Sequence, residues 1–104
     1  MDRQVIWTES AWEDLERIAE TIAIDSPFYA ASFVERIRDK GRRLAVIPEA
    51  GAIVPEFDDP LIREVFEKSY RLIYHVGNEV VSVLGLIHGA RELLPLWNPE
   101  KRHP

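Results

Sequence analysis

The chain has 104 residues, of which 46% are hydrophobic and 30% are charged, and its net charge at neutral pH is −5. This composition is ordinary for a globular protein and supplies enough apolar residues for one hydrophobic core. The chain contains no cysteine, which excludes disulfides, thiolate catalysis and zinc–thiolate sites. The acidic balance opposes a general attraction to nucleic acid. We therefore expect a single domain spanning residues 1–104.

Two further features bear on location. The longest apolar run, residues 80–87, is far shorter than the roughly 20 residues that a membrane-spanning helix needs. The first residues lack the apolar segment of a secretory signal peptide. We expect no association with a membrane and a cytoplasmic location.

The N-terminal part predicts a short strand followed by a helix. Residues 5–7 are apolar and bounded by polar residues, as in a strand. Thr8 or Ser10 can cap the helix, and Ser10 with Glu13 fits a capping box. Apolar residues then recur at helical spacing: Trp12, Leu15, Ile18, Ala19 and Ile22.

A second helix is predicted after Ser26-Pro27, because proline suits the first helical position. Its apolar stripe consists of Ala30, Phe33, Val34, Ile37, Gly41 and Leu44. A connection of about three residues makes the two helices an antiparallel hairpin, with close helix approach at Gly41. Residues 9–25 hold six acids and one base, whereas residues 35–43 hold five bases and two acids. These charges fit two solvated helix faces or a surface that docks a partner.

The C-terminal half predicts strands. Residues 49–60 indicate an irregular loop, and residues 61–66 a strand. Residues 70–76 and 80–88 form two β-rich runs joined by Gly77-Asn78. With these two residues as the turn and Gly77 at positive φ, Tyr74 faces Val81, Leu72 faces Val83 and Arg71 faces Leu84. Residues 93–104 are expected to be extended.

Alternation along these strands separates two faces of the predicted sheet. The core face carries Tyr70, Leu72, Tyr74, Val81, Val83 and Ile87, and the opposite face carries Arg71, His75, Ser82 and His88. We expect a buried cluster of Leu15, Ile18, Phe33, Ile37, Leu72 and Val83. The fold class is therefore α+β with the order β-α-α-β-β-β, in which an antiparallel helical hairpin packs on a small, mainly antiparallel sheet.

Seven short motifs occur in order along nearly the whole chain. They are Trp7 with Ala11, Asp14-Leu15 and Ile18; Asp25-Ser26-Pro27 with Ala30 and Ala31; Leu44, Pro48 and Gly51; Val54-Pro55-Glu56; Ile62-Arg63-Glu64; Tyr70-Arg71-Leu72-Ile73-Tyr74; and His88-Gly89-Ala90-Arg91. The sequence resembles the RelE/ParE superfamily, the toxins and plasmid stabilisation proteins of type II toxin–antitoxin systems. The resemblance implies a toxin neutralised by an antitoxin in a hetero-oligomer. Its ParE-like branch poisons DNA gyrase, and its RelE-like branch cuts mRNA on the ribosome.

The two branches require different chemistry. Cleavage of RNA by its 2′-hydroxyl needs a base, cations for the phosphorane and a proton donor. The RelE-like branch is similar to this chain at Arg71 and Arg91. Where that branch has a lysine pair and a C-terminal tyrosine, this chain has Ile62-Arg63-Glu64 and Trp97. An indole cannot act as an acid or base near neutral pH, so we favour the ParE-like branch.

The alternative is a ribonuclease that resembles the YoeB toxins, with Glu56 as base, Arg71 as cation and His88 as proton donor. The predicted register places His88 about 13 Å along the strand from the partner of Arg71, which argues against that site. Arg71 can instead form an ion pair with Glu64 or Glu67, and His88 can be structural. No catalytic residue is therefore favoured, the alternative set being Glu56, Arg71, His88 and Arg91.

The residues expected to bind the target or the antitoxin are Arg63, Arg71, His88, Arg91 and Trp97. Trp97 is either a lid on the sheet or an exposed anchor for a partner. The histidines show no ligand spacing, so neither a metal site nor a cofactor is expected. The expected partners are an antitoxin and gyrase, or alternatively the ribosome and mRNA. The antitoxin is expected to lie across the helical hairpin and an edge of the sheet.

Overall fold

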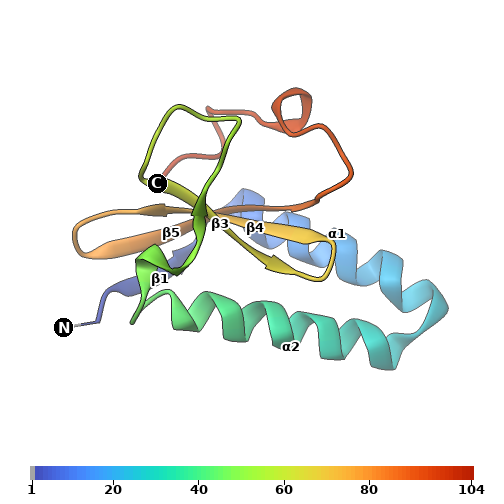
Figure 1. Cartoon of the computed structure of the whole chain (residues 1–104). Coiled ribbons are helices and arrows are strands. Elements are labelled where there is room, and N and C mark those ends of the chain that lie inside the picture. Colours follow the sequence, from blue (N-terminus) through green and yellow to red (C-terminus); the bar gives the residue numbers. More distant parts are fainter. Residues whose placement is uncertain (1) are drawn as a thin grey trace.

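The computed structural model describes residues 2–104. Its elements are β1 (Gln4–Trp7), α1 (Glu9–Asp25), α2 (Pro27–Arg43), the 3₁₀ helix η1 (Pro48–Ala50), β2 (Ala52–Ile53), β3 (Ile62–Glu67), β4 (Tyr70–Val76), β5 (Val80–His88) and the 3₁₀ helix η2 (Leu94–Leu96). The strands form one sheet in the order β1-β5-β4-β3-β2, in which β1 and β5 are parallel and the other pairs antiparallel (Figure 1). The α+β prediction is confirmed. The segment 49–60 is more regular than predicted, because it contains η1 and the edge strand β2.

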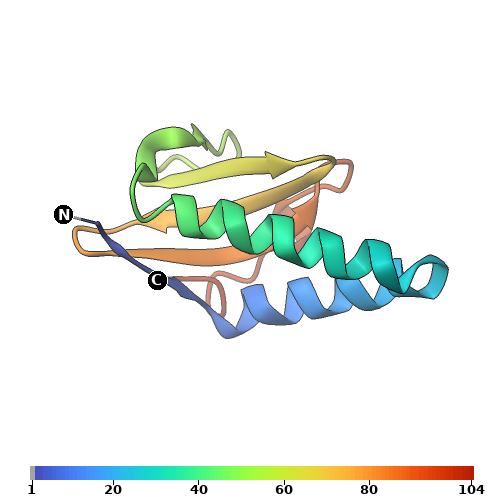
Figure 2. The ribbon, with the colours of Figure 1, turned by 90° about the horizontal axis from the view of Figure 1, so that it is seen from below.

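The two helices form an antiparallel hairpin that covers one face of the sheet (Figure 2). Thr8 caps α1, since its hydroxyl accepts a hydrogen bond from the Ala11 amide at 3.2 Å. Ser10 lies inside the helix and donates to the Lys101 carbonyl, so the predicted capping box is wrong. Ser26 caps α2 and is the only residue between the helices, where about three were expected.

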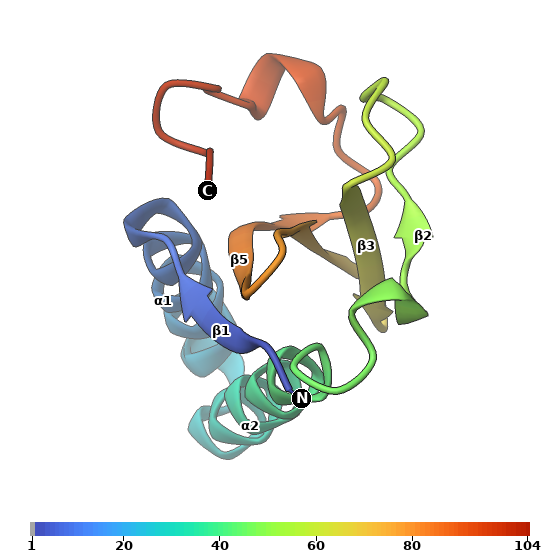
Figure 3. The same cartoon turned by 90° about the vertical axis from the view of Figure 1, so that its left-hand side faces the viewer.

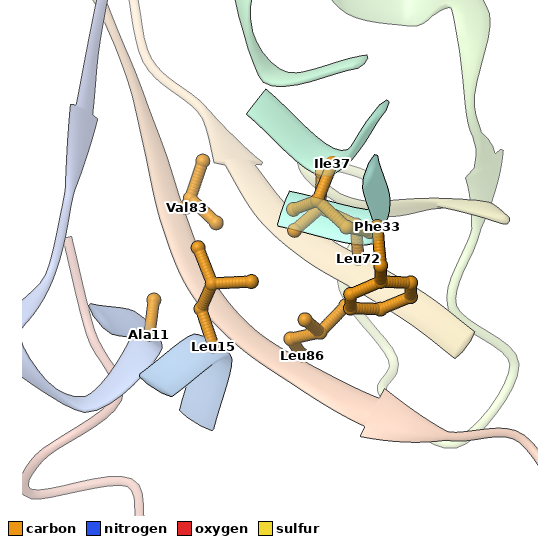
Figure 4. Close-up of a cluster of buried hydrophobic side chains, with 7 residues drawn as sticks. All are labelled: Ala11, Leu15, Phe33, Ile37, Leu72, Val83 and Leu86. Carbon is orange, nitrogen blue, oxygen red and sulfur yellow. The ribbon is translucent and has the colours of Figure 1, made fainter. Parts of the chain in front are cut away.

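The core between the helices and the sheet matches the prediction. Its fully buried residues are Ala11, Leu15, Phe33, Ile37, Leu72, Val83 and Leu86 (Figure 4), and Ile18 packs against them. Gly41 does lie at a close approach, but its neighbour is the ring of Trp7 rather than a helix. A Cβ added to Gly41 would lie 3.4 Å from that ring.

The β4–β5 hairpin differs from the predicted register. Val76 pairs with Val81 and Tyr74 with Val83, and the Gly77 amide donates to the Val80 carbonyl at 2.9 Å. The turn is therefore centred on residues 78 and 79. No glycine among residues 2–104 has positive φ, so the predicted role of Gly77 in the turn is wrong. The shift is by two residues, which preserves the side-chain faces up to Val83.

An irregularity in β5 changes the faces beyond that point. Tyr74 pairs with Val83 but Ile73 pairs with Gly85, which leaves Leu84 as the extra residue of a β-bulge. One extra residue moves every following side chain to the other face. Arg71 consequently faces Ile87, and Tyr70 faces His88. The predictions that Ile87 lies on the helix side and His88 on the side of Arg71 are both wrong.

The face of the sheet away from the helices is covered as well. Its buried residues are Val54, Ile73, Ile87 and Leu93, and Phe57, Ile62, Leu96 and Trp97 pack against them. Figure 3 shows the C-terminal segment on this side of the sheet and the helices on the other. Residues 93–104 contain η2 and a turn, where an extended tail was expected. Within the described chain, neither helix is long and apolar enough to cross a membrane.

Candidate functional site

The most conspicuous charged group on the face away from the helices is a buried cluster around Arg71. The Arg71 guanidinium donates from Nη1 and Nη2 to the two carboxylate oxygens of Glu56, both at 2.7 Å, and from Nε to Glu64. Arg71 is only 6% exposed and Glu64 7%. β4 positions the arginine, β3 positions Glu64, and the loop after β2 brings in Glu56. Glu67, the other predicted partner, instead binds Arg36 and Lys40 of α2.

The electrostatics of this cluster oppose its use in catalysis. The hydrogen bond from Arg71 lowers the pKa of Glu56, because it stabilises the carboxylate. The two glutamates, Glu56 first, raise the pKa of Arg71. A carboxylate whose pKa is lowered is a weaker general base, and an arginine held by two carboxylates leaves little positive charge for a phosphate.

Arg63 and Tyr74 form hydrogen bonds with the backbone just before β2, the edge strand of the sheet. The Arg63 guanidinium donates to the Gly51 carbonyl at 2.9 Å. The buried Tyr74 hydroxyl donates to the Pro48 carbonyl and accepts from the Gly51 amide, and burial raises its pKa. A Cβ on Gly51 would lie 2.4 Å from the Glu64 carbonyl oxygen, so the close approach requires glycine. These contacts give Arg63 a structural role, and its binding of a partner stays a prediction.

His88 is separated from the Arg71 cluster. Its ring packs edge-on against Tyr70, with 5.0 Å between the ring centroids, and Tyr70 packs in turn on Phe33 of α2. His88 therefore lies on the helix side, whereas Arg71 points to the other side. Its Nδ1 accepts from the Ala90 amide at 3.1 Å, which places the proton of the neutral ring on Nε2. The structure thus brings Glu56 and Arg71 together but leaves His88 apart from them.

The C-terminal segment is fixed by an ion pair that the sequence did not reveal. Arg102 donates two hydrogen bonds to Asp14 of α1, at 2.6 and 2.9 Å, and a third to the Leu84 carbonyl at 3.0 Å. Asp14 also accepts from the Leu86 amide at 3.0 Å. Both backbone groups lie in β5 just beyond Val83, the last residue that pairs with β1. Asp14 and Arg102 therefore satisfy the strand edge that β1 leaves open.

Trp97 lies between this ion pair and the loop before β3. Its ring is 5.2 Å from that of Phe57, and the Arg102 guanidinium stacks over it at 5.2 Å. A Cβ on Gly85 would meet Trp97 at 3.1 Å and Arg102 at 2.6 Å. Trp97 is thus half-buried against the sheet, as in the lid alternative.

A second feature is a cleft of about 560 Å³ between α1, the end of β5 and η2. Arg91, a predicted binding residue, lines it together with Arg17, His88 and Arg102. Within residues 2–104 the Arg91 side chain has no hydrogen-bond or ion-pair partner. No group of three His, Cys, Asp or Glu residues in the described chain is arranged to hold a metal ion.

Comparisons with known proteins identify the family of this chain. The family model described as the ParE toxin of the type II toxin–antitoxin system parDE matches residues 5–93. The chain belongs to the ParE toxin family. A comparison with curated proteins finds no significant match for this ParE-family toxin.

Two solved structures share the fold of this ParE-family toxin. One is the chromosomal ParDE toxin–antitoxin system from P. aeruginosa, with a TM-score of 0.69 and 21% identity over 83% of this chain and 95% of the other. The second is the toxin–antitoxin complex RelBE2 from Mycobacterium tuberculosis, with a TM-score of 0.59 and 21% identity over 85% of this chain and 99% of the other.

Proposed function

We propose that this ParE-family toxin poisons DNA gyrase by binding, without chemistry of its own, and that a cognate antitoxin neutralises it. The observation that carries the proposal is the state of Arg71, the cation on which both ribonuclease alternatives depend. Its guanidinium is held by Glu56 and Glu64, and the cluster has a net charge of −1. Such a cluster repels a phosphate rather than stabilising a phosphorane.

The separation of His88 from Arg71 supports the same proposal. A general acid must lie within hydrogen-bond reach of the leaving oxygen that the cation also stabilises. His88 lies on the helix side of the sheet with Tyr70, whereas Glu56 and Arg71 lie on the other side. The contact between Glu56 and Arg71 favours the YoeB-like alternative, since both residues belong to its site.

The antitoxin belongs to the proposal through the family and its solved relatives. The family is described as the toxin of a type II system, and the two relatives are described as a ParDE system and a RelBE2 complex. We propose that a small protein encoded beside this chain binds it and suppresses its toxicity. Exposed apolar residues at the hairpin tip, Ile24 and Phe28, suit an amphipathic partner segment.

Induction of the toxin in growing cells tests this function. We expect filamentation with an SOS response, the same response with His88→Gln, and relief by co-expression of the adjacent small protein. Glutamine keeps the size and hydrogen bonding of His88 but cannot transfer protons near pH 7, so a nuclease would lose several orders of magnitude of its chemical step. Rapid arrest of translation with cleaved mRNA, abolished by His88→Gln, would overturn the proposal and support the ribonuclease.

A further inference from the structure

The free polar groups in the cleft between α1, β5 and η2 are nearly all hydrogen-bond donors. Asp14 is its one acid, and it accepts four N–H groups: two from Arg102, one from Arg17 and one from the Leu86 amide. Those bonds use the acceptor capacity of its two oxygens. An incoming ligand therefore meets Asp14 as a neutralised group rather than as a free anion.

Three other residues supply unpaired nitrogen donors. Arg91 has no side-chain partner within residues 2–104, and Arg17 is 60% exposed and reaches only Asp14. His88 presents Nε2–H, because its Nδ1 accepts from the Ala90 amide. Three arginines against one carboxylate make this cleft locally cationic in a chain of net charge −5. Such a set of donors fits an oxyanion.

The surroundings of the cleft favour the carboxylate of a peptide over the phosphates of a nucleic acid. Its walls include the apolar side chains of Ile18, Leu86 and Leu96, which fit the side chains of a peptide. The exposed face of α1 beside Arg17 carries Glu13, Glu16 and Glu20, which would repel the extended negative charge of a nucleic acid. A single carboxylate on an otherwise apolar segment meets no such repulsion.

We infer that this cleft is the docking site of an acidic, apolar-flanked segment of the antitoxin, with a partner carboxylate between Arg17 and Arg91. This inference rests on the proposed function, because it locates the partner named there. Arg102 holds the wall of the site by its bonds to Asp14 and Leu84, and it is a positioning residue.

Affinity measurements with the purified adjacent-gene protein test the site. Arg91→Glu should weaken binding by about 30-fold or more, since it replaces an attraction to the partner carboxylate with a repulsion. Arg17→Gln should weaken it in the same direction. Lys101→Glu is the matched control, because Lys101 is an exposed cation of the same C-terminal segment that does not line this cleft. Its affinity should stay close to that of the wild type.

Four results would overturn the inference. Unchanged affinity in Arg91→Glu and Arg17→Gln would contradict the site while leaving the antitoxin in place. An equal loss of affinity in Lys101→Glu would show that the effect arises from the net charge of the protein and not from this cleft. A labelled DNA duplex bound by the wild type and released by Arg91→Glu, with antitoxin affinity unchanged, would assign the cleft to nucleic acid. Wild-type protein that does not bind the adjacent-gene protein at all would contradict the proposed function and this inference together.

Discussion

Arg71 determines the chemistry of the sheet face that lies away from the helices. The residue types at Glu56, Glu64 and Arg71 are those of a polar site, but their contacts make them an ion cluster in which Arg71 and Glu64 are buried. The sequence correctly placed Arg71 away from the helices and named Glu64 as a partner. It could not show that Glu56 also binds Arg71, because that contact depends on the path of the loop after β2.

Replacing Arg71 should show how much its ion pair with the buried Glu64 contributes to the free energy of unfolding. In Arg71→Met, Glu64 stays buried without its counter-charge, so we expect a loss of about 3 kcal/mol in the free energy of unfolding. The double variant Arg71→Met/Glu64→Met removes both charges and should recover much of that loss. Urea unfolding followed by circular dichroism measures both. A single variant as stable as the wild type would mean that the cluster is not formed in solution.

Glu56 gives this cluster a pH dependence. Arg71 lowers its pKa in the folded state below 4.5, the ordinary value, so the folded state binds the proton more weakly than the unfolded chain. The stabilisation is therefore complete above about pH 4.5 and is lost as pH falls through the lowered pKa. Glu56→Gln should show a shallower loss of stability over this acidic range. An identical acid profile for both proteins would argue against the ion pair.

Elements that depend on local sequence are predicted correctly, whereas those that depend on tertiary contacts are not. The helices, their stripes and the strands β3 to β5 follow from periodicity and capping, which are local. The bulge at Leu84, the short strand β2 and the packed C-terminal segment depend on tertiary contacts. Asp14 and Arg102 are 88 residues apart, so no local pattern could pair them. The bulge alone reversed the faces of Ile87 and His88, and it places His88 on the side of the sheet opposite Arg71.

Leu72 tests the core shared by the helices and the sheet. It is fully buried against Leu15, Phe33 and Ile37. Leu72→Ala should lower the free energy of unfolding by about 2–5 kcal/mol through lost burial and a residual cavity. The control Ile24→Ala changes a side chain that is 83% exposed and should alter stability by less than about 0.5 kcal/mol. Equal melting temperatures for the two variants would contradict this core.

Arg102 tests the attachment of the C-terminal segment. Arg102→Ala leaves the buried Asp14 with only Arg17 and the Leu86 amide as partners, so we expect a loss of about 3 kcal/mol. The same substitution should accelerate hydrogen exchange of the amides in residues 93–104. Arg17→Ala removes the exposed partner and should cost less than about 1 kcal/mol. Unchanged exchange in Arg102→Ala would show that the segment is held by other contacts.

At the scale of the whole molecule, both faces of the sheet are occupied. The helices cover one, and the loop after β2 with the C-terminal segment covers the other (Figure 3). The exposed surface includes the cationic cleft, the apolar hairpin tip, the acidic face of α1 and the basic C-terminal half of α2. This surface suits protein partners more than a nucleic acid, because the chain is acidic overall and its most buried arginine is neutralised.

Inhibition of the supercoiling activity of purified gyrase tests whether this toxin poisons gyrase. Relaxed plasmid, ATP and gyrase are incubated with increasing amounts of the toxin, and the same series is repeated with the adjacent-gene protein present. We predict that the toxin inhibits supercoiling, that His88→Gln does so equally, and that the adjacent-gene protein restores it. Full supercoiling at saturating toxin, together with cleavage of mRNA in programmed ribosomes, would contradict the account.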